Sequence, residues 1–425
     1  MDIVDRFPLY PLIYSFIVYP AIAWVLLRII KGKAQMPLFA VFSVFSLAVM
    51  CWLSGARAVR LAFVVPYTKA ALIFFLFYLG FILTFYVILR QSKKHAAMWT
   101  ACFLVPIAFL VFIKYLSVYV NPFGFLLVPA GLSHYEAFFL GISYLSFRFV
   151  LLAVEVRNEV VPTPTFWEYC AYATYAPTLS IGPINHYSKF IGSIRNPDRT
   201  ETPVGRSLLR ILVGFTKYIF LSSIAAQFTY AGLLRDGHPH ASIDAYISIL
   251  VFPMYLYLNF SGFCDVVIGV SGLLGIQVSE NFDQPFLARN FQEFWNRWHI
   301  TLSIWIRDLV FTPLSKALVR RFGPRQASHC VAAAIMVAFI GVGMWHGRGL
   351  NFFVFGILQG AGLVTVHYYT VWLKKKLGRE GYAKYRQNNA IRYLTTGMTY
   401  AYFAFTLILF ANTWSQIGDL IRVLV

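Results

Sequence analysis

The sequence predicts an all-α polytopic membrane protein. Hydrophobic residues make up 59% of its 425 positions and charged residues only 12%, whereas soluble domains carry about 25% charged residues. So few charges cannot cover the surface of a water-soluble fold of this size. Glycine and proline are scattered through the apolar runs, which membrane helices tolerate. These observations argue against an apolar soluble protein.

The apolar runs are long enough to cross a bilayer, because a span needs about 20 mainly apolar residues. The 165–185 run contains Pro177 and Pro183 and is expected to be broken or re-entrant. The 242–275 run either tilts strongly or divides into two elements around Asn259–Gly262. In all we expect about 11 transmembrane or half-inserted helices, near 9–30, 37–54, 70–90, 97–118, 136–154, 165–185, 207–234, 242–275, 327–346, 349–372 and 391–415.

The distribution of lysine and arginine predicts the orientation. The loops near 119–134 and 236–245 carry neither residue, and the segment with Arg57, Arg60 and Lys69 departs from the alternating pattern. Basic loops face the cytoplasm, so we expect the N-terminus outside a cell inner (cytoplasmic) membrane. The net charge of +19 then indicates anionic lipid headgroups as partners and no nucleic acid. The basic loops are Arg28–Lys33, Arg90–Lys94, Lys189–Arg210, Lys316–Arg325 and Lys374–Arg392.

Nothing in the sequence divides the chain. The five cysteines form no CxxC pair and lie mostly inside apolar runs, so we expect buried thiols, no disulfide framework and no metal site. The first apolar run lacks a basic leader and is expected to span the membrane rather than to be a cleaved signal. We find no low-complexity linker and no repeat, and treat residues 1–425 as a single membrane-embedded domain.

Residues 276–325 are too polar for lipid and too aromatic for a solvated loop. Asn290, with Glu293 three positions on, predicts a helix that starts near Phe291. Pro313 is expected to end or bend this helix. The helix would lie half-inserted and carry His299 toward the protein interior. One face would combine Trp295, His299, Leu302, Ser303 and Ile306, and another would carry Arg297, Thr301 and Asp308.

His346 is the histidine best placed for chemistry. It ends the 327–346 run, beside Trp345, and Gly343 and Gly347 would let another chain or a substrate approach closely. A neutral histidine could remove the proton of an acceptor hydroxyl. His299 or Asn296 could orient the substrate or stabilise the oxyanion. A structural histidine at position 346 remains an alternative on the residues alone.

The motifs that surround these histidines resemble those of the membrane-bound O-acyltransferases. The similar stretches are Glu280–Phe286, Phe294–Ser303 and Trp305–Asp308, with Trp345–Gly347 as the second histidine block; Asn259–Gly262 with Asp265, Gly182–Ile184 and Gly141–Ser143 are also similar. The resemblance covers residues 110–370. It implies a central tunnel through the helices.

The resemblance also implies the roles of individual residues. His346 would be the catalytic residue and His299 the second active-site residue. We assign to substrate binding the neighbouring polar and aromatic residues Trp298, Asn296, Ser303, Trp345, Asn259 and Asp265. No cofactor would be tightly bound. An acyl thioester donor, on carrier-protein phosphopantetheine or coenzyme A, would arrive from the cytoplasm, and a glycan or polymer hydroxyl from the other side, with envelope proteins as further partners.

Two bacterial branches fit these motifs. One resembles polysaccharide O-acetyltransferases and the other resembles the teichoic-acid D-alanyltransferase. Ser315 and Lys316 follow Pro313-Leu314 where polysaccharide acetylases usually have a Gly-Gly-Asn-Arg-like run. This departure, together with the compact length, favours the alanyl-transfer branch without deciding it.

Two other classes of function remain as alternatives. A transporter or flippase of cell-envelope precursors would explain broken helices and buried histidines. It would normally place ionisable residues in several spans, whereas Asp265 is the clearest one here. A non-enzymatic assembly scaffold is the third alternative.

Overall fold

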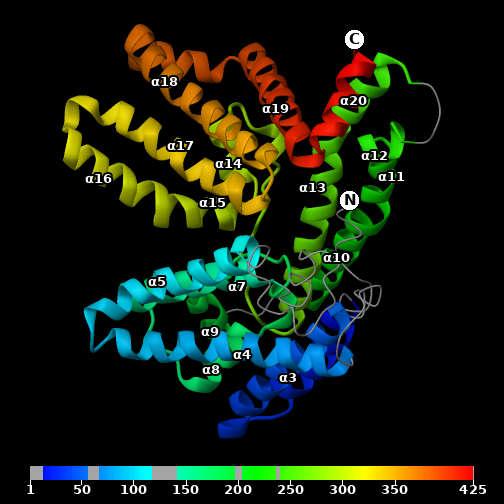
Figure 1. The fold of residues 1–425 in the computed structure, drawn as a ribbon, viewed down its shortest axis with the longest axis vertical. Helices are drawn as coiled ribbons and strands as arrows, with labels where there is room; N and C mark the ends of the chain where they lie inside the picture. The colour runs from blue at the N-terminus through cyan, green and yellow to red at the C-terminus, as the bar shows by residue number, and fades with distance from the viewer. Residues whose placement is uncertain (1–12, 56–66, 117–140, 197–202, 236–239, 425) are drawn as a thin grey trace. The chain divides into compact units, whose positions relative to one another are not determined.

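The computed structural model describes residues 13–55, 67–116, 141–196, 203–235 and 240–424. These ranges are mainly helical and contain no β-strand, only one isolated bridge (Figure 1). The predicted all-α fold is therefore confirmed. Eight helical stretches are long and apolar enough to cross a membrane, namely Gly32–Leu53, Ala71–Ser92, Ala96–Leu116, Val204–Gln227, Ser242–Leu273, Pro324–His346, Leu350–Gln387 and Asn389–Ala411.

The chain forms two compact units. Unit 1 comprises Met1–Gly214 and Phe263–Ser279, and unit 2 comprises Phe215–Gly262 and Glu280–Val425. The helix α13 (Ser242–Leu273) contributes to both. The bare loop at 119–134 and the segment around Arg57 and Arg60 lie outside the described residues.

Unit 1 is built around buried aromatic rings. Phe85 stacks on Phe149 with ring centroids 4.3 Å apart, and Phe149 stacks on Tyr169 at 5.7 Å. In this unit α3 packs on α8 and α4, and α5 packs on α4 and α7. Its helices are α2 (Tyr19–Arg28), α3 (Gln35–Gly55), α4 (Tyr67–Ser92), α5 (Ala96–Val111), α7 (Ile142–Arg157), α8 (Phe166–Ala173), α9 (Tyr187–Arg195) and α10 (Val204–Phe215).

The 165–185 run is broken, as its prolines predict. Helix α8 ends at Ala173, and only a short 3-10 turn, Ala176–Thr178, follows. The fully buried guanidinium of Arg148 donates to the carbonyls of Tyr172 and Ala173 and to the Thr178 hydroxyl. These carbonyls would otherwise lack partners, because the helix does not continue. Arg148 therefore stabilises the break from the neighbouring helix α7.

Unit 2 is a set of helices packed around α18. Helix α17 packs against α18, and α18 against α19 and α14. Gln359 of α18 accepts a hydrogen bond from Trp295 Nε1 at 3.2 Å and donates to Thr406 Oγ1 of α19 at 2.7 Å. The helices include α11 (Ser222–Gln227), α12 (Tyr230–Leu233), α14 (Phe291–Arg297), α15 (Ile300–Ile306), α16 (Thr312–Phe322), α17 (Ala327–His346), α18 (Leu350–Gln387), α19 (Asn389–Ala411) and α20 (Trp414–Leu424).

Two predictions about helix continuity are corrected. The 242–275 run is one helix, α13, of 32 residues, so its division around Asn259–Gly262 is wrong. At about 1.5 Å per residue it is roughly 48 Å long, more than the hydrocarbon core of about 30 Å. Pro313 does not end its helix either. It is the second residue of α16, which follows directly on a π-helical turn at Arg307–Phe311.

The expected single helix from Phe291 onward is wrong. The observed helix α14 does start at Phe291, with the Asn290 side chain accepting from the Glu293 N–H at 2.9 Å. It then stops at Arg297, because Trp298 is extended and His299 is left-handed. The predicted common face across this segment therefore does not exist as one helical stripe, and Thr301, placed on the other face, is buried.

Candidate active site

A short antiparallel contact holds the break between α14 and α15. Phe282 forms an isolated bridge with Trp298. The Asp283 N–H donates to the Arg297 carbonyl at 3.0 Å, and the Ile300 N–H donates to the Asn281 carbonyl at 2.9 Å. The backbone groups that would continue α14 are thus used by the Asn281–Asp283 segment, which fixes where His299 leaves the helix.

His299 occupies a strained backbone position. Its φ is 44° and its ψ is 53°, a left-handed conformation that residues other than glycine adopt rarely. Such strain concentrates at functional sites. The side chain is 3% exposed, and its ring lies edge-on against Phe260 with centroids 4.9 Å apart. The prediction that His299 points into the protein is confirmed, although a chain break rather than a helix face places it there.

The hydrogen bonds of Asn281 determine the His299 tautomer. Asn281 Oδ1 accepts from the Thr301 N–H at 3.2 Å and from Thr301 Oγ1 at 2.9 Å. The same oxygen lies 3.1 Å from His299 Nδ1. An amide oxygen only accepts, so His299 Nδ1 carries the proton. Nε2 of the neutral ring then carries the lone pair.

Burial also determines the charge of His299. Removal from water lowers the pKa of this imidazole from 6.5 to about 3, because a low-dielectric environment disfavours the charged form. His299 is therefore neutral between about pH 5 and pH 8. A group with so low a pKa is a weak base, which suits it to orient a substrate by accepting a hydrogen bond.

The same burial predicts a pH dependence of stability. The folded-state pKa lies below the unfolded value of about 6.5, so the unfolded chain binds more protons and stability falls as pH drops below 6.5. We expect His299 to remove about 2 kcal/mol of stability between pH 7.5 and pH 5. Thermal unfolding in detergent at both pH values would measure this. In the His299→Asn protein, the loss of stability between pH 7.5 and pH 5 should be smaller by about 2 kcal/mol. An unchanged loss of stability would contradict the low pKa of His299.

His346 lies at the C-terminal end of α17, among aromatic rings. Its half-buried ring contacts Phe410 of α19 edge-on at 5.0 Å and Phe355 of α18 at 6.0 Å. The glycines on either side of it allow α18 of the same chain, and not a substrate, to approach closely. A Cβ on Gly343 would lie 2.3 Å from the Phe352 carbonyl oxygen, and one on Gly347 would lie 2.1 Å from the Phe352 ring.

Trp345 brings the two histidine blocks together. Its indole lies 4.5 Å from the His346 ring and 6.4 Å from the His299 ring, measured between centroids. Both contacts lie within unit 2. The sequence could not show that His299 and His346 meet, since they belong to separate motifs; the structure places both beside one indole.

The other predicted substrate-binding residues have different surroundings. Trp298 is buried among Phe282, Phe294 and Phe403, and Ser303 Oγ donates to the Trp298 carbonyl at 3.1 Å. These two residues hold the α14–α15 break. Asn296 is exposed on α14.

Asn259 and Asp265, both on α13, differ from each other. Asn259 is 5% exposed, next to the Phe260 that contacts His299, and its Nδ2 has no hydrogen-bond partner among the described residues. A buried donor of this kind can bind a ligand acceptor. Asp265 belongs to unit 1, where it accepts from Arg210 Nη2 at 2.9 Å.

Two further residues of unit 2 were not singled out from the sequence. Asn281 lies inside the Glu280–Phe286 motif, but its contact with His299 is tertiary. Lys217 Nζ donates to Ser261 Oγ at 3.2 Å and lies 5.7 Å from the Tyr257 ring centroid. An ionisable residue within an apolar span is a signal of function, and this signal could have identified Lys217.

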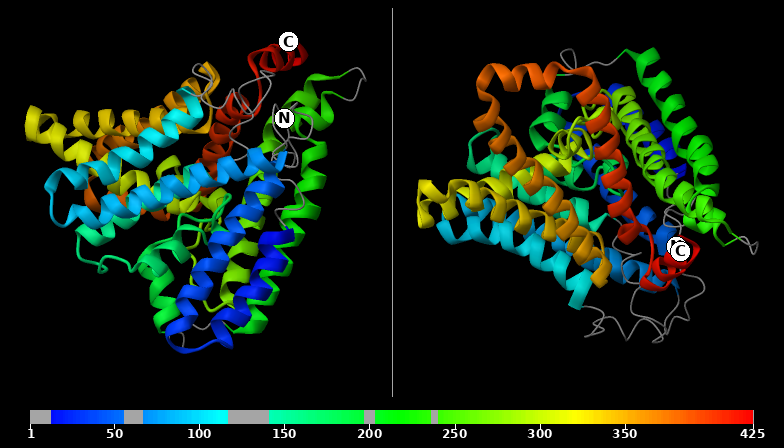
Figure 2. Two further views of the ribbon diagram at one scale, coloured as in Figure 1. Left: turned by 60° about the horizontal axis from the view of Figure 1, so that its bottom comes forward. Right: turned by 90° about the horizontal axis from the view of Figure 1, so that it is seen from above.

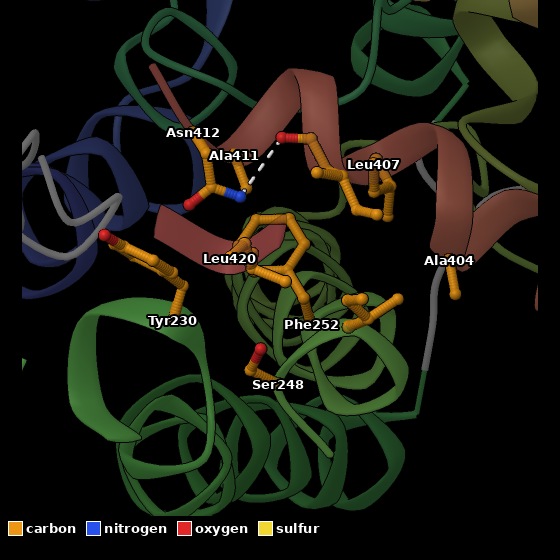
Figure 3. A pocket seen from close by; sticks show the side chains of 10 residues that line it. Tyr230, Ser248, Phe252, Ala404, Leu407, Ala411, Asn412 and Leu420 are labelled. Atoms are coloured by element: carbon orange, nitrogen blue, oxygen red, sulfur yellow. Dashed lines mark hydrogen bonds between the residues drawn. The ribbon is translucent and has the colours of Figure 1, made fainter. Parts of the chain in front are cut away.

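A very small cavity lies where α12, α13, α19 and α20 meet (Figure 3). Its volume of about 10 Å³ is about that of one water-sized probe. The polar groups on its wall are satisfied, since Tyr230 donates to Asp419 at 3.2 Å and Asn412 Nδ2 donates to the Ile408 carbonyl at 3.1 Å. This cavity is a packing junction between helices and not a substrate site.

Comparison with known proteins supports the resemblance seen in the motifs. Residues 131–410 match the membrane-bound O-acyltransferase family. The chain is 33% identical over 244 residues to the teichoic acid D-alanyltransferase of Streptococcus thermophilus, covering 56% of this chain and 58% of that protein. It is 26% identical over 268 residues to a probable alginate O-acetylase of Pseudomonas putida, covering 61% and 53%.

A further relative is the peptidoglycan O-acetyltransferase of Helicobacter pylori. The identity is 30% over 205 residues, which cover 48% of this chain and 37% of that protein. The chain thus spans between about a third and three fifths of the length of these relatives. The matched stretch of the family includes both His299 and His346.

Proposed function

Since the chain belongs to the membrane-bound O-acyltransferase family, we propose that it transfers an acyl group from a thioester donor to a hydroxyl of a cell-surface polymer, with His346 as general base. One observation carries this proposal: His346 and His299 flank the same indole, that of Trp345. A reacting hydroxyl beside this indole would have a basic nitrogen on one imidazole and a second, oriented imidazole close by.

The proton balance assigns separate tasks to the two histidines. The acceptor hydroxyl attacks the thioester carbonyl carbon while its proton passes to the His346 ring. The carbon–sulfur bond then breaks, and the proton passes from His346 to the leaving thiolate. His299 stays neutral throughout and accepts a hydrogen bond from the substrate at Nε2, because Nδ1 donates to Asn281. Asn259 Nδ2 supplies a buried donor for a substrate oxygen.

For the acyl group we favour D-alanyl, carried by a phosphopantetheine-bearing carrier protein, with a teichoic-type polymer as acceptor. The 33% identity to a teichoic acid D-alanyltransferase supports this choice, as does the Ser315-Lys316 pair after Pro313-Leu314. Acetyl transfer to a glycan is the second candidate, supported by the alginate and peptidoglycan O-acetylating relatives. In both cases the donor approaches from the cytoplasmic side of the inner membrane, as the family resemblance implies, and the orientation predicted from the basic loops agrees with this.

Reconstitution in vesicles tests the reaction and the donor together. The protein is supplied with labelled D-alanyl carrier protein or labelled acetyl-coenzyme A, and label in the polymer is counted. We expect label from D-alanyl carrier protein to enter a teichoic-type polymer. Label only from acetyl-coenzyme A would select the second candidate. Movement of unlabelled polymer across the vesicle membrane without any donor, and no label transfer, would identify a transporter instead.

A further inference from the structure

Unit 2 contains a large cavity that plays no part in the proposed reaction. Its volume is about 710 Å³, within the range of small-molecule sites. Its walls are formed by Arg289–Phe291 at the start of α14, by both parts of α18 and by the N-terminal part of α19. The two histidines and Trp345 do not line it.

A turn inside α18 creates this cavity. Gly378 has φ 63° and ψ −172°, so it interrupts the helical backbone between Leu350 and Gln387. Glycine adopts this conformation without the steric cost of a side chain. Beyond the turn α18 continues in a new direction and α19 runs back (Figure 2, right). Residues of all three segments line the cavity.

The charge of the cavity wall is entirely positive. Arg289, Arg386 and Arg392 line it, and no aspartate or glutamate does so in the part of the chain that the structure describes. Arg289 Nη1 donates to the Arg386 backbone carbonyl at 2.9 Å, which holds two of the three residues together. None of the three forms a salt bridge with a described residue. Three guanidinium groups without a carboxylate favour an anion, and arginine matches phosphate oxygens particularly well.

Part of the cavity wall is apolar and exposed. Leu394 and Met398 of α19 line the cavity and are 66% and 61% exposed. Both α18 and α19 are long and apolar enough to span a membrane. An exposed apolar wall on a membrane helix faces lipid chains, whereas a soluble ligand would find no partner there.

We propose that this cavity binds one anionic phospholipid. The phosphate lies against Arg386 and Arg392, and an acyl chain lies along Leu394 and Met398. Hydroxyl groups of Tyr369 and Tyr385, 3.3 Å apart, stand near the phosphate end. This proposal does not depend on the proposed acyl transfer, since the residues that line the cavity are not the ones assigned to that reaction.

The bound lipid would also hold helix α14. Phe291, its first residue, lines the cavity and contacts Tyr402 edge-on at 5.0 Å. The other end of α14 is the break at Trp298–His299. A lipid in this cavity therefore braces the helix that ends two residues before His299, without touching the reacting groups.

Native mass spectrometry of the full chain in detergent tests the proposal. The protein is mixed with phosphatidylglycerol or with phosphatidylcholine of the same acyl chains. We expect one retained phosphatidylglycerol per chain. In the double variant Arg386→Gln with Arg392→Gln, we expect phosphatidylglycerol binding to weaken about thirtyfold, since each basic residue contributes to headgroup binding.

The matched control is Lys375→Gln with Lys384→Gln. These two exposed lysines of α18 remove the same charge but do not line the cavity. The control should bind phosphatidylglycerol as the wild type does. Equal retention of phosphatidylcholine, or equal weakening in the control, would overturn the proposal. Displacement of the lipid by free 4′-phosphopantetheine would also overturn it, because the cavity would then belong to the acyl donor.

Discussion

Replacing His346 by alanine is expected to lower the rate of acyl transfer by about a thousandfold, the usual effect of losing a general base. The acceptor hydroxyl would keep its proton and attack the thioester poorly. The label-transfer assay in vesicles measures this, at equal amounts of folded protein. His346→Gln, which keeps most of the side-chain volume against Phe410 and Phe355, should be equally inactive.

His367→Ala is the matched control for this experiment. His367 lies on α18, is half-buried, and its Nε2 lies 2.9 Å from Ser328 Oγ. Its hydrogen bond to Ser328 indicates a structural role in the packing of α18 against α17. The His367→Ala protein should keep most of the activity. If the His346→Ala protein transferred acyl groups at the wild-type rate, His346 would not be the base.

The second large effect is expected from Asn281. Asn281→Leu removes the oxygen that His299 Nδ1 and Thr301 share. The imidazole would then lose its fixed tautomer and orientation, and we expect kcat to fall about a hundredfold, as for loss of a group that orients a catalytic imidazole. His299→Ala should be at least as severe. Steady-state rates with the preferred donor provide the measurement.

The conservative variant separates positioning from stability. Asn281→Asp keeps an oxygen acceptor at the same place and should recover much of kcat. Its carboxylate should raise the pKa of His299, so a new dependence of rate on pH should develop above pH 5. Asn388→Leu is the control, because it removes one backbone cap at Ile391 and nothing at the histidines. Similar loss in the Leu and Asp variants, with no change in pH profile, would leave Asn281 a purely structural residue.

Some features of the site could be predicted because they are local. The start of α14 at Phe291 depends on one side chain, that of Asn290, which accepts from Glu293 three residues on. The break in the 165–185 run follows from its prolines. His299 and His346 could be selected because ionisable residues are rare in a chain of this composition.

Other features depend on tertiary contacts, which the spacing of residues along the sequence does not reveal. Helical spacing placed His299 on a continuous helix, yet that helix ends at Arg297, two residues before His299, where Phe282 pairs with Trp298. Asp265 was grouped with the active-site residues by its motif, whereas its partner is Arg210 in unit 1. The continuity of α13 was left open, since the glycine and proline in the run do not show whether a helix continues through them.

The sequence by itself determined that this protein resides in a membrane, is helical, and carries two histidine motifs of the O-acyltransferase family. Composition and run length suffice for the first two, because lipid accepts only backbone that satisfies its own hydrogen bonds. The tertiary structure alone decided that both motifs meet at Trp345 and that Asn281 fixes the His299 tautomer. It also revealed the arginine-lined cavity beside α18. These features join residues far apart in the chain, and their energies come from packing that local patterns do not contain.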